Sequence, residues 1–399
     1  MGSPSDGISE AFRKFVTTMH APVVMQVIPA LNAGGVEQGV IDISAAIVRA
    51  GGKSIVVSSG GRRVPEITRG GGLHITLPVN SKNPFVMAAN IFRLRRLIVE
   101  YGVDLVHPCS RAPAWSAAAA VKGTRARLVT SIHSAHKASG TLKRFYNSSI
   151  TKGERVIAVS HFLADELERN YNVDPEKIRV VHRGVMVERF HPASVSPERM
   201  IKVAQQWRVP DGAHIVMLPA RLTRIKGHMF LIDAITQLAN PDVFCLFVGG
   251  DGTKSYRAEL EEYISRNGLE GRVRIVNHCD DMPAAYMLAN IVVTPSLVPE
   301  GFGRIAIEAQ AMGRPVIATD HGGARETIQR DETGWLVLPG DVDGLTRALK
   351  GALSLDARQR AMLATRAMNH VMKHFTNEKM CAATLDVYAE LLDSPRRKG

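Results

Sequence analysis

The feature that most constrains the fold is a pattern that occurs twice between Ile291 and Ile328: an apolar run, a loop with glycine and a helical segment. The apolar runs, Ile291–Val293 and Val316–Ala318, are short and bounded by turn-forming residues, which predicts buried strands. The first helical segment ends at Gly313, a residue typical of helix C-termini. Two such units in succession predict a parallel α/β sheet whose helix N-termini can receive an anion.

The same alternation of apolar strands and amphipathic helices runs through the rest of the chain. It begins with a predicted strand at Val23–Leu31, followed by a glycine loop and a helix at Val36–Ala50. It restarts at His214, after the segment Arg183–Pro192. The chain has 399 residues, enough for two domains. We therefore expect two doubly wound α/β domains facing a cleft.

Two carboxylates within the repeated pattern are candidate ligand-binding residues. Glu300 lies in the loop, and Glu308 lies on the helix that follows. Because helical side chains tilt toward the helix N-terminus, Glu308 can point toward the pocket that Glu300 enters. A helix start attracts phosphate and carboxylates accept hydrogen bonds from hydroxyls, and a nucleotide sugar offers both groups. The alternative is that Glu308 is a solvated helix residue and Glu300 an ordinary loop charge.

The segment PEGFGRIAIEA resembles the E-x7-E motif of the retaining glycosyltransferases of family four, which have the GT-B fold. The match includes Phe302 and Gly303 between the glutamates, and the resemblance extends over most of the chain. It implies that Glu300 binds hydroxyls of the donor sugar and that Glu308 binds the ribose. It also places Phe302 and Gly303 in the donor-binding site.

Three further side chains match donor-binding residues of this family. Arg221 and Lys226, in the loop RLTRIKG, match two cations that bind the donor diphosphate. The alternative is that both are surface charges. His133 ends a predicted strand and matches a histidine that touches the donor sugar. For this residue the alternative is a structural hydrogen bond.

Three loops are expected to approach the donor closely. Gly34 and Gly35 belong to a GGVE segment that resembles the family's opening loop, which faces the donor phosphates and the acceptor. Gly250 lies in a close-approach loop after a predicted strand. His278 and Cys279 stand where the family usually has a glycine beside the nucleobase. This departure leaves the donor base unpredicted.

The resemblance also suggests the domain boundaries. The segment RGVMVERFHP, Arg183–Pro192, resembles the hinge between the two domains of this fold. We expect an N-terminal acceptor-side domain at residues 1–188, joined by a returning C-terminal helix at 378–399. We expect the donor domain at residues 189–377.

A D-x-D match at Asp341–Asp343 could indicate a metal site, as it does in another transferase fold. It opens a predicted helix far along the chain from the donor motif. We therefore interpret Asp341 as a helix cap and expect no metal ion.

The net charge of +12 lies mainly in the first half of the chain. Residues 1–188 hold 24 Lys and Arg against 14 Asp and Glu, whereas residues 189–399 hold 26 against 24. A basic domain attracts nucleic acid, anionic lipid or a phosphorylated glycan. The segment Lys137–Lys152 interleaves basic residues with Phe145 and Tyr146, which is typical of a helix on an anionic membrane surface. The alternatives are an ordinary surface helix and a basic surface without a partner.

The cysteines favour a reducing cytosol, and two other features argue against a membrane span and an export signal. The four cysteines show no metal-ligand spacing, and three lie in or beside apolar strand-like runs, which predicts free buried thiols. No run approaches the roughly 18 apolar residues of a membrane span. Pro22 and Pro29 interrupt the apolar run near the N-terminus, so we interpret it as a core strand rather than an export signal.

These observations predict an enzyme that moves a hexosyl unit from a nucleotide sugar to an acceptor hydroxyl. The resemblance implies retention of configuration by front-face attack, without a metal ion or cofactor. GDP-mannose is our first choice of donor. An envelope glycolipid such as the lipopolysaccharide core, reached from the cytoplasmic face of the inner membrane, is our first choice of acceptor. The alternatives are a phosphorylase of the same fold and a basic nucleic-acid-binding protein, for which no recognised motif is present.

Overall fold

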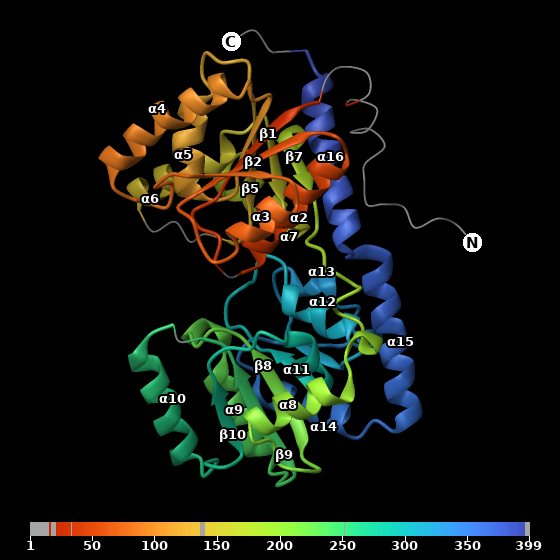
Figure 1. Ribbon diagram of the computed structural model, residues 1–399. Helices are drawn as coiled ribbons and strands as arrows, with labels where there is room; N and C mark the ends of the chain where they lie inside the picture. The colour runs from red at the N-terminus through yellow and green to blue at the C-terminus, as the bar shows by residue number, and fades with distance from the viewer. Residues whose placement is uncertain (1–15, 17–20, 33, 136–139, 251, 396–399) are drawn as a thin grey trace, which may run out of the picture. The chain divides into compact units, whose positions relative to one another are not determined.

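The computed structural model describes residues 16, 21–32, 34–135, 140–250 and 252–395 (Figure 1). Predictions for other residues, which include Lys137 of the basic segment and the C-terminal tail, lie outside these ranges. The chain forms two compact units, one of Met1–Gly184 with Asn377–Gly399 and one of Val185–Thr376. Within the described ranges, no helix combines the length and the apolar character that a bilayer crossing requires.

The first unit is built on a seven-stranded parallel sheet in the order β3-β2-β1-β4-β5-β6-β7. The order reverses between β1 and β4, which is the doubly wound arrangement. Its strands are β1 (Val23–Val27), β2 (Lys53–Ser58), β3 (Leu73–Thr76), β4 (Leu105–Pro108), β5 (Arg127–Ile132), β6 (Arg155–Ala158) and β7 (Ile178–Val180). Its helices are α2 (Gly35–Arg49), α3 (Val64–Arg69), α4 (Pro84–Glu100), α5 (Arg111–Ala120), α6 (Thr141–Asn147), α7 (His161–Tyr171) and α16 (Asn377–Asp393), with short 3-10 helices η1 (Ser148–Thr151) and η2 (Pro175–Lys177).

Both faces of this sheet are buried. Successive side chains along each strand point to opposite faces. Val24 of β1 packs with Ile47 of α2 and Leu385 of α16 on one face. The next residue, Met25, packs with Leu94 of α4 on the other face. Burial on both faces explains why the strand residues are apolar throughout rather than alternating with polar ones.

The C-terminal helix α16 is joined to the sheet by buried polar contacts. His107 Nδ1 of β4 lies 2.6 Å from the Tyr388 hydroxyl, and both side chains are buried. Burial lowers the pKa of His107 to about 3, so the ring is neutral. Further along the helix, Glu390 forms ion pairs with Arg155 at 2.7 Å and Arg179 at 2.5 Å. The first unit therefore depends on residues from both ends of the sequence.

The second unit repeats the plan with six parallel strands in the order β10-β9-β8-β11-β12-β13. The order reverses between β8 and β11. Its strands are β8 (His214–Pro219), β9 (Val243–Val248), β10 (Val273–Val276), β11 (Ile291–Thr294), β12 (Val316–Thr319) and β13 (Trp335–Val337). Its helices are α8 (Pro197–Gln206), α9 (His228–Leu238), α10 (Lys254–Arg266), α11 (Met282–Leu288), α12 (Arg304–Ala311), α13 (Ala324–Thr327), α14 (Val342–Leu353) and α15 (Ala357–His374), with 3-10 helices η3 (Pro192–Ser194) and η4 (Arg224–Lys226).

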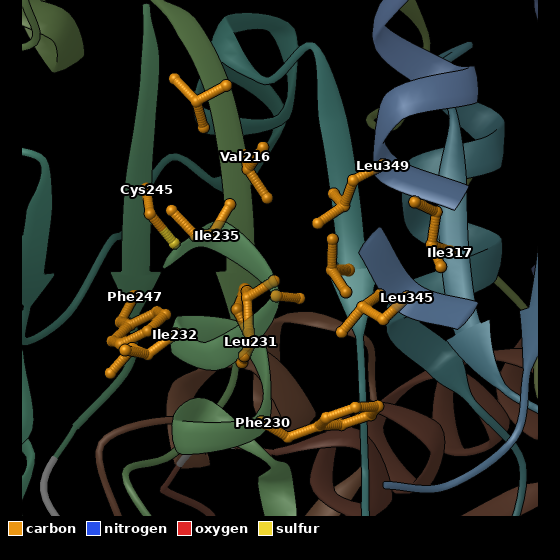
Figure 2. Packing of buried hydrophobic residues seen from close by; sticks show 14 of the residues in the cluster. Val216, Phe230, Leu231, Ile232, Ile235, Cys245, Phe247, Ile317, Leu345 and Leu349 are labelled. Atoms are coloured by element: carbon orange, nitrogen blue, oxygen red, sulfur yellow. The ribbon is translucent and has the colours of Figure 1, made fainter. Parts of the chain in front are cut away.

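A layer of α9 and α14 covers one face of this sheet and forms its main core (Figure 2). Leu231 of α9 and Leu345 of α14 are fully buried beside strand residues such as Ile317. Figure 2 shows these side chains pointing toward one another between the helices and the strands. The two predicted doubly wound sheets are thus present in the structure.

Short polar side chains fix where several helices begin. Asp341 accepts a hydrogen bond from Gly344 N at 2.8 Å and caps α14, which confirms its predicted role. Asp356 and Gln359 form a capping box at the start of α15. The second helix of the repeated pattern, α13, is present and is a single turn.

The buried bond between His107 and Tyr388 predicts a stability effect. Tyr388→Phe removes the hydroxyl and leaves His107 Nδ1 without its partner, which should lower the free energy of unfolding by about 1–3 kcal/mol. Denaturant unfolding measures this change. Tyr101→Phe is the matched control, because Tyr101 is exposed, and should change stability by less than about 0.5 kcal/mol. Equal stability of the Tyr388 variant and the wild type would contradict the structural importance of this bond.

Candidate functional site

In the second unit, two loops meet at the point where the strand order reverses. One follows β8 and carries Lys226, and the other follows β11 and carries Glu300; the two strands are parallel neighbours. Lys226 Nζ lies 2.7 Å from Glu300 Oε1. Ligands of open α/β sheets bind at the carboxyl ends of strands at such a reversal. The structure therefore brings two of the predicted site residues into direct contact where a ligand is expected.

The close approach of these loops depends on Gly227, which begins α9 with a φ of 74°. A Cβ at this position would lie 1.9 Å from the carbonyl oxygen of Pro295. No other residue fits between the loops without moving the backbone, and only glycine adopts this φ without strain. The next residue, His228, is buried, and burial lowers its pKa to about 4, so it adds no charge beside Lys226.

Glu300 is held by more than the lysine. The hydroxyl of Ser296 donates a hydrogen bond to the same carboxylate oxygen, and His321 Nε2 lies 2.8 Å from the Ser296 carbonyl oxygen. Burial raises the pKa of Glu300, but the charge and hydrogen bond of Lys226 and the hydrogen bond of Ser296 outweigh it, so the pKa lies below its ordinary value of 4.5. Glu300 is therefore an ionised carboxylate in a fixed orientation.

The loop of Glu300 is supported by two glycines that follow β12. Gly323 N donates to the Glu300 carbonyl oxygen at 2.9 Å. A Cβ on Gly323 would lie 2.3 Å from Phe302 Cα, and one on Gly322 would lie 2.5 Å from the Glu300 carbonyl oxygen. Phe302 is buried against Phe375 with ring centroids 5.6 Å apart. These glycines permit close packing of the two loops, and Gly323 is also the residue that precedes α13.

Glu308 lies on α12 with a separate set of partners. Its carboxylate is 2.9 Å from Arg304 Nε, one helical turn earlier, and accepts a hydrogen bond from the buried Tyr286 hydroxyl at 2.9 Å. The pair with Arg304 directs the Glu308 side chain toward the helix start, as the tilt of helical side chains predicts. Gly303 precedes the helix with a φ of 95° and provides no side-chain cap. The cap residue therefore supplies no side-chain acceptor to the N–H groups of the first turn.

Arg221 follows β8 directly and is exposed. Its neighbour Arg224 is engaged elsewhere, in an ion pair with Glu259 and with its guanidinium 5.1 Å from the centre of the Tyr256 ring. Arg224 is therefore already paired within the protein. Among the described residues, no carboxylate pairs with Arg221, which leaves its guanidinium available to an anion.

The loop after β9 borders the Arg221 loop, and the loop after β10 lies next to the β9 loop. Leu222 N donates to the Gly250 carbonyl oxygen at 3.1 Å, and the nearest atom to a Cβ on Gly250 would be 3.8 Å away. His278 is exposed and lies 2.8 Å from Asp280. Cys279 is partly buried, and burial raises the pKa of its thiol to about 11, so the thiol is protonated and unreactive.

In the first unit, the predicted residues lie at the equivalent reversal, between β1 and β4. A cavity of about 280 Å³ is lined there by residues that include Glu37, Arg111 and His133. Gly34 precedes α2 with a φ of 142°, and its missing Cβ leaves room for the Glu37 carboxylate. Gly35 is the first residue of α2. Figure 1 shows α2 following β1 in this unit.

His133 has two polar neighbours in this region. Its Nε2 lies 2.9 Å from Ser131 Oγ, and its Nδ1 lies 3.1 Å from Arg183 Nη2. A guanidinium only donates hydrogen bonds, so Nδ1 is the acceptor and Nε2 carries the hydrogen. Ser131 and Arg183 therefore fix the tautomer and the orientation of the ring.

Several partners were not predicted from the sequence. The pair of Arg304 and Glu308 has the i, i+4 spacing of a helical ion pair, so the sequence contained a signal for it. Tyr286 and Ser131 carried no such signal. Tyr286 lies on α11 and Glu308 on α12, so the bond between them depends on the tertiary fold rather than on sequence spacing.

The Lys226–Glu300 pair predicts a change in the pH dependence of stability. A folded-state pKa below the ordinary value stabilises the fold above about pH 4.5, and this stabilisation is lost as the pH falls through the folded-state pKa. Lys226→Met removes the cation, so burial of Glu300 is no longer offset and its pKa rises. The variant should therefore gain less unfolding free energy than the wild type between acid and neutral pH, because the contribution of Glu300 is lost while those of Asp281, Asp320 and Glu390 remain.

Denaturant unfolding at a series of pH values measures this effect. Lys350→Met, at an exposed position of the same unit, is the control and should keep the wild-type profile. A Lys226→Met profile with the same slope as the wild type would show that the ion pair does not stabilise the folded state.

Comparison with known proteins was made on sequence and structure. The family model described as Glycosyltransferase Family 4 matches residues 33–189, and the model described as Glycosyl transferases group 1 matches residues 200–370. A crystal structure of a glycosyltransferase from Rickettsia africae ESF-5 is similar, with 36% identity and a TM-score of 0.86, over 94% of this chain and 100% of that one.

Two other relatives are informative. A D-inositol 3-phosphate glycosyltransferase of Salinispora tropica is 32% identical over 62% of this chain and 53% of its own length. The chain thus spans about half the length of the curated relatives it matches. Anabaena Alr3699/HepE, crystallised with UDP, is 23% identical with a TM-score of 0.80, covering 92% of this chain and 99% of that one, and shares the fold.

Proposed function

We propose that this protein transfers a sugar from a nucleotide sugar to an acceptor hydroxyl. The chain belongs to the glycosyltransferases of family four and group 1, with the GT-B fold. The observation that carries the proposal is the contact of Lys226 with Glu300 at the strand-order reversal of the second unit. A cation and an ionised carboxylate side by side suit a ligand that carries both phosphate and hydroxyl groups.

The proposed donor contacts follow from the character of each group. Arg221 and Lys226 bind the diphosphate, with the first-turn N–H groups of α12 after Gly303 as further donors. Lysine has three N–H donors, so Lys226 can bind a phosphate oxygen and keep its bond to Glu300. Glu300 accepts hydrogen bonds from hydroxyls of the sugar, and Glu308 accepts those of the ribose. Backbone groups near Phe302, Gly250, His278 and Cys279 complete the donor site.

In the first unit, the predicted residues lie around a cavity of their own. His133, whose ring is oriented by Ser131 and Arg183, lines the cavity of this unit and is our candidate for contact with the donor sugar. Gly34 and Gly35 allow the backbone at the start of α2 to approach the ligand closely. The cavity beside them, with Glu37 and Arg111 in its lining, suits an acceptor that carries hydroxyl groups and a negative charge.

The proposed chemistry retains the configuration at the anomeric carbon. The bond from this carbon to the diphosphate oxygen breaks, and a bond to the acceptor oxygen forms on the same face of the sugar. The acceptor proton passes to the departing phosphate oxygen. Arg221, Lys226 and the start of α12 stabilise the charge that develops on the diphosphate, which is electrostatic catalysis. The proposal requires no metal ion and no cofactor.

The finer substrate assignments rest on charge. Residues 1–188 hold 24 basic against 14 acidic residues, which favours an anionic acceptor. The curated relatives are named for an acceptor that carries a phosphate group. We propose a hexosyl donor, with GDP-mannose as the first to test, and a phosphorylated envelope glycan or glycolipid such as the lipopolysaccharide core as acceptor. The free thiols Cys109, Cys245 and Cys381 are buried, which supports a cytoplasmic location.

Two alternatives are distinguished by simple assays. A phosphorylase of the same fold would release a sugar phosphate when inorganic phosphate replaces the acceptor. A nucleic-acid-binding protein would retard nucleic acid in gels at physiological salt. Transfer of sugar without either behaviour supports the glycosyltransferase.

The first test concerns the diphosphate. Thermal-shift screening with nucleoside diphosphates identifies the ligand, and calorimetry then measures its affinity for the variants. Arg221→Ala and Lys226→Ala should each weaken binding by about 2 kcal/mol, as expected for a charged hydrogen-bond partner. Arg224→Ala is the matched control from the same loop, because its guanidinium is engaged with Glu259. Unchanged affinity in a folded Arg221→Ala protein would exclude this phosphate site.

The second test separates the two glutamates. Glu308→Ala should weaken binding of the free nucleotide and of the sugar nucleotide to a similar extent, because the ribose is common to both. Glu300→Ala should lower turnover and spare the free nucleotide, because only the sugar contacts this carboxylate. Calorimetry with both ligands and a transfer assay measure these effects. Equal loss of the free nucleotide in both variants would show that the two roles are assigned incorrectly.

A further inference from the structure

The outer face of α4 carries a line of exposed apolar side chains. Phe85, Phe92 and Val99 are 84%, 72% and 70% exposed. They follow one another at intervals of seven residues, which places them within about 40° of one another around the helix. At 1.5 Å per residue the line is about 21 Å long. We call these three residues the α4 stripe.

The stripe is not needed to build the first unit. The opposite side of the same helix already supplies the core, through Met87, Leu94 and Ile98, which are all buried. A helix that is apolar on its inner side for packing has no folding reason to be apolar on its outer side. Two exposed phenylalanines on one line point to a partner that the isolated chain lacks.

Basic residues flank the stripe on both sides. Arg93, Arg95 and Arg96 lie on α4, and Lys82 lies just before it, whereas the helix has a single acidic residue, Glu100. Arg96 is 84% exposed, and Arg95 donates to the carbonyl oxygens of Ala119, Ala120 and Lys122 at the end of α5. The face therefore combines protruding aromatic rings with a net positive charge.

The helix α6 extends this surface. Between them, α5 packs against both α4 and α6, and Figure 1 shows the three helices on the same side of the first unit. On α6, Lys143 and Arg144 are exposed and Phe145 is 61% exposed. Lys152 Nζ lies 5.9 Å from the centre of the Phe145 ring. The part of the predicted basic–aromatic segment that is described thus repeats the character of α4.

We propose that the α4 stripe rests on an anionic lipid bilayer, with the rings of Phe85 and Phe92 in the interface and the flanking arginines at the headgroups. Aromatic and apolar side chains insert at the boundary of headgroups and acyl chains. Long basic side chains extend past them to anionic headgroups. The helix lies flat on the surface and does not cross it. This contact brings the enzyme to an acceptor embedded in the membrane, so the proposal rests on the proposed function and adds where the acceptor is reached.

A second copy of the chain fits the stripe less well. A helix pair needs apolar residues at both repeating positions of a heptad. The residues three positions after Phe85 and Phe92 are Ala88 and Arg95, so the second position is small or charged. Pairing two such helices would also bring like charges together. A bilayer needs no such complementarity.

Vesicle flotation tests the proposal, with phosphatidylcholine vesicles that contain or lack phosphatidylglycerol. The wild-type protein should float with the anionic vesicles, and less so at high salt. Phe85→Ser/Phe92→Ser should reduce the apparent affinity about tenfold or more, because two rings no longer enter the interface. Arg93→Glu/Arg96→Glu should reduce it similarly and remove most of the salt dependence. Lys143→Glu/Arg144→Glu should have a smaller effect if α4 is the main contact.

The controls separate this proposal from the proposed function. Met362→Ser/Met372→Ser removes two side chains that are 50% and 51% exposed on α15 and should leave flotation unchanged. Nucleoside diphosphate affinity should be the same in the wild type and the α4 variants, because the proposed phosphate contacts belong to the second unit. If the wild type bound no nucleoside diphosphate, the proposed function would therefore be wrong, whereas the membrane proposal would be unaffected.

Two results would overturn the membrane proposal. One is the absence of wild-type flotation at low salt, and the other is flotation of the Phe85→Ser/Phe92→Ser protein equal to that of the wild type. Sedimentation analysis tests whether a second copy of the chain binds the stripe instead. A wild-type dimer that becomes a monomer on substitution of the stripe would assign this face to a second copy of the chain.

Discussion

The reversal of strand order between β8 and β11 is the constraint on which the site in the second unit depends. Loops that leave neighbouring strands at such a point run in opposite directions and leave a gap at the carboxyl edge of the sheet. Here the gap is bridged by the ion pair of Lys226 and Glu300. The bridge forms only because Gly227 permits one loop to approach the other, and because Gly322 and Gly323 allow the Glu300 loop to pack closely from its other side. The three glycines, which have no side chains, thus determine where the charged groups lie.

Most of the fold could be predicted because its signal is local. Short apolar runs between turn residues identified strands, and glycines identified helix ends, so two parallel doubly wound sheets were expected and are present. Extents were less accurate. The expected strand at Val23–Leu31 ends at Val27, although Ile28 N still donates to the Val57 carbonyl oxygen at 3.0 Å and Leu31 is buried. The helix expected after Gly323 is present and spans only Ala324–Thr327.

The sequence identified candidate site residues but not their partners. Motif spacing singled out Glu300 and Glu308, the family resemblance added Arg221 and Lys226, and the structure places Lys226 against Glu300. Nothing local in the sequence indicates that Tyr286 donates to Glu308 or that Arg183 orients His133. Those contacts join residues brought together by packing. The exposure of Phe85 and Phe92 was equally hidden, because an apolar residue in a helix is ordinarily assigned to the core, and only the structure shows that α4 is apolar on two sides.

The docking of α16 against α2 and β4 affects the order in which the chain acquires its structure. Residues 185–376 are synthesised as one continuous segment and can complete their own core as they emerge. The first unit, although it comes first in the sequence, lacks Met380, Cys381, Leu385 and Tyr388 until the ribosome has made the segment after residue 376. Until then Ile43 and Ile47 of α2 remain without their partners. The later half of the protein therefore matures before the earlier half, and the nascent chain is most exposed to aggregation while its first sheet awaits its last helix.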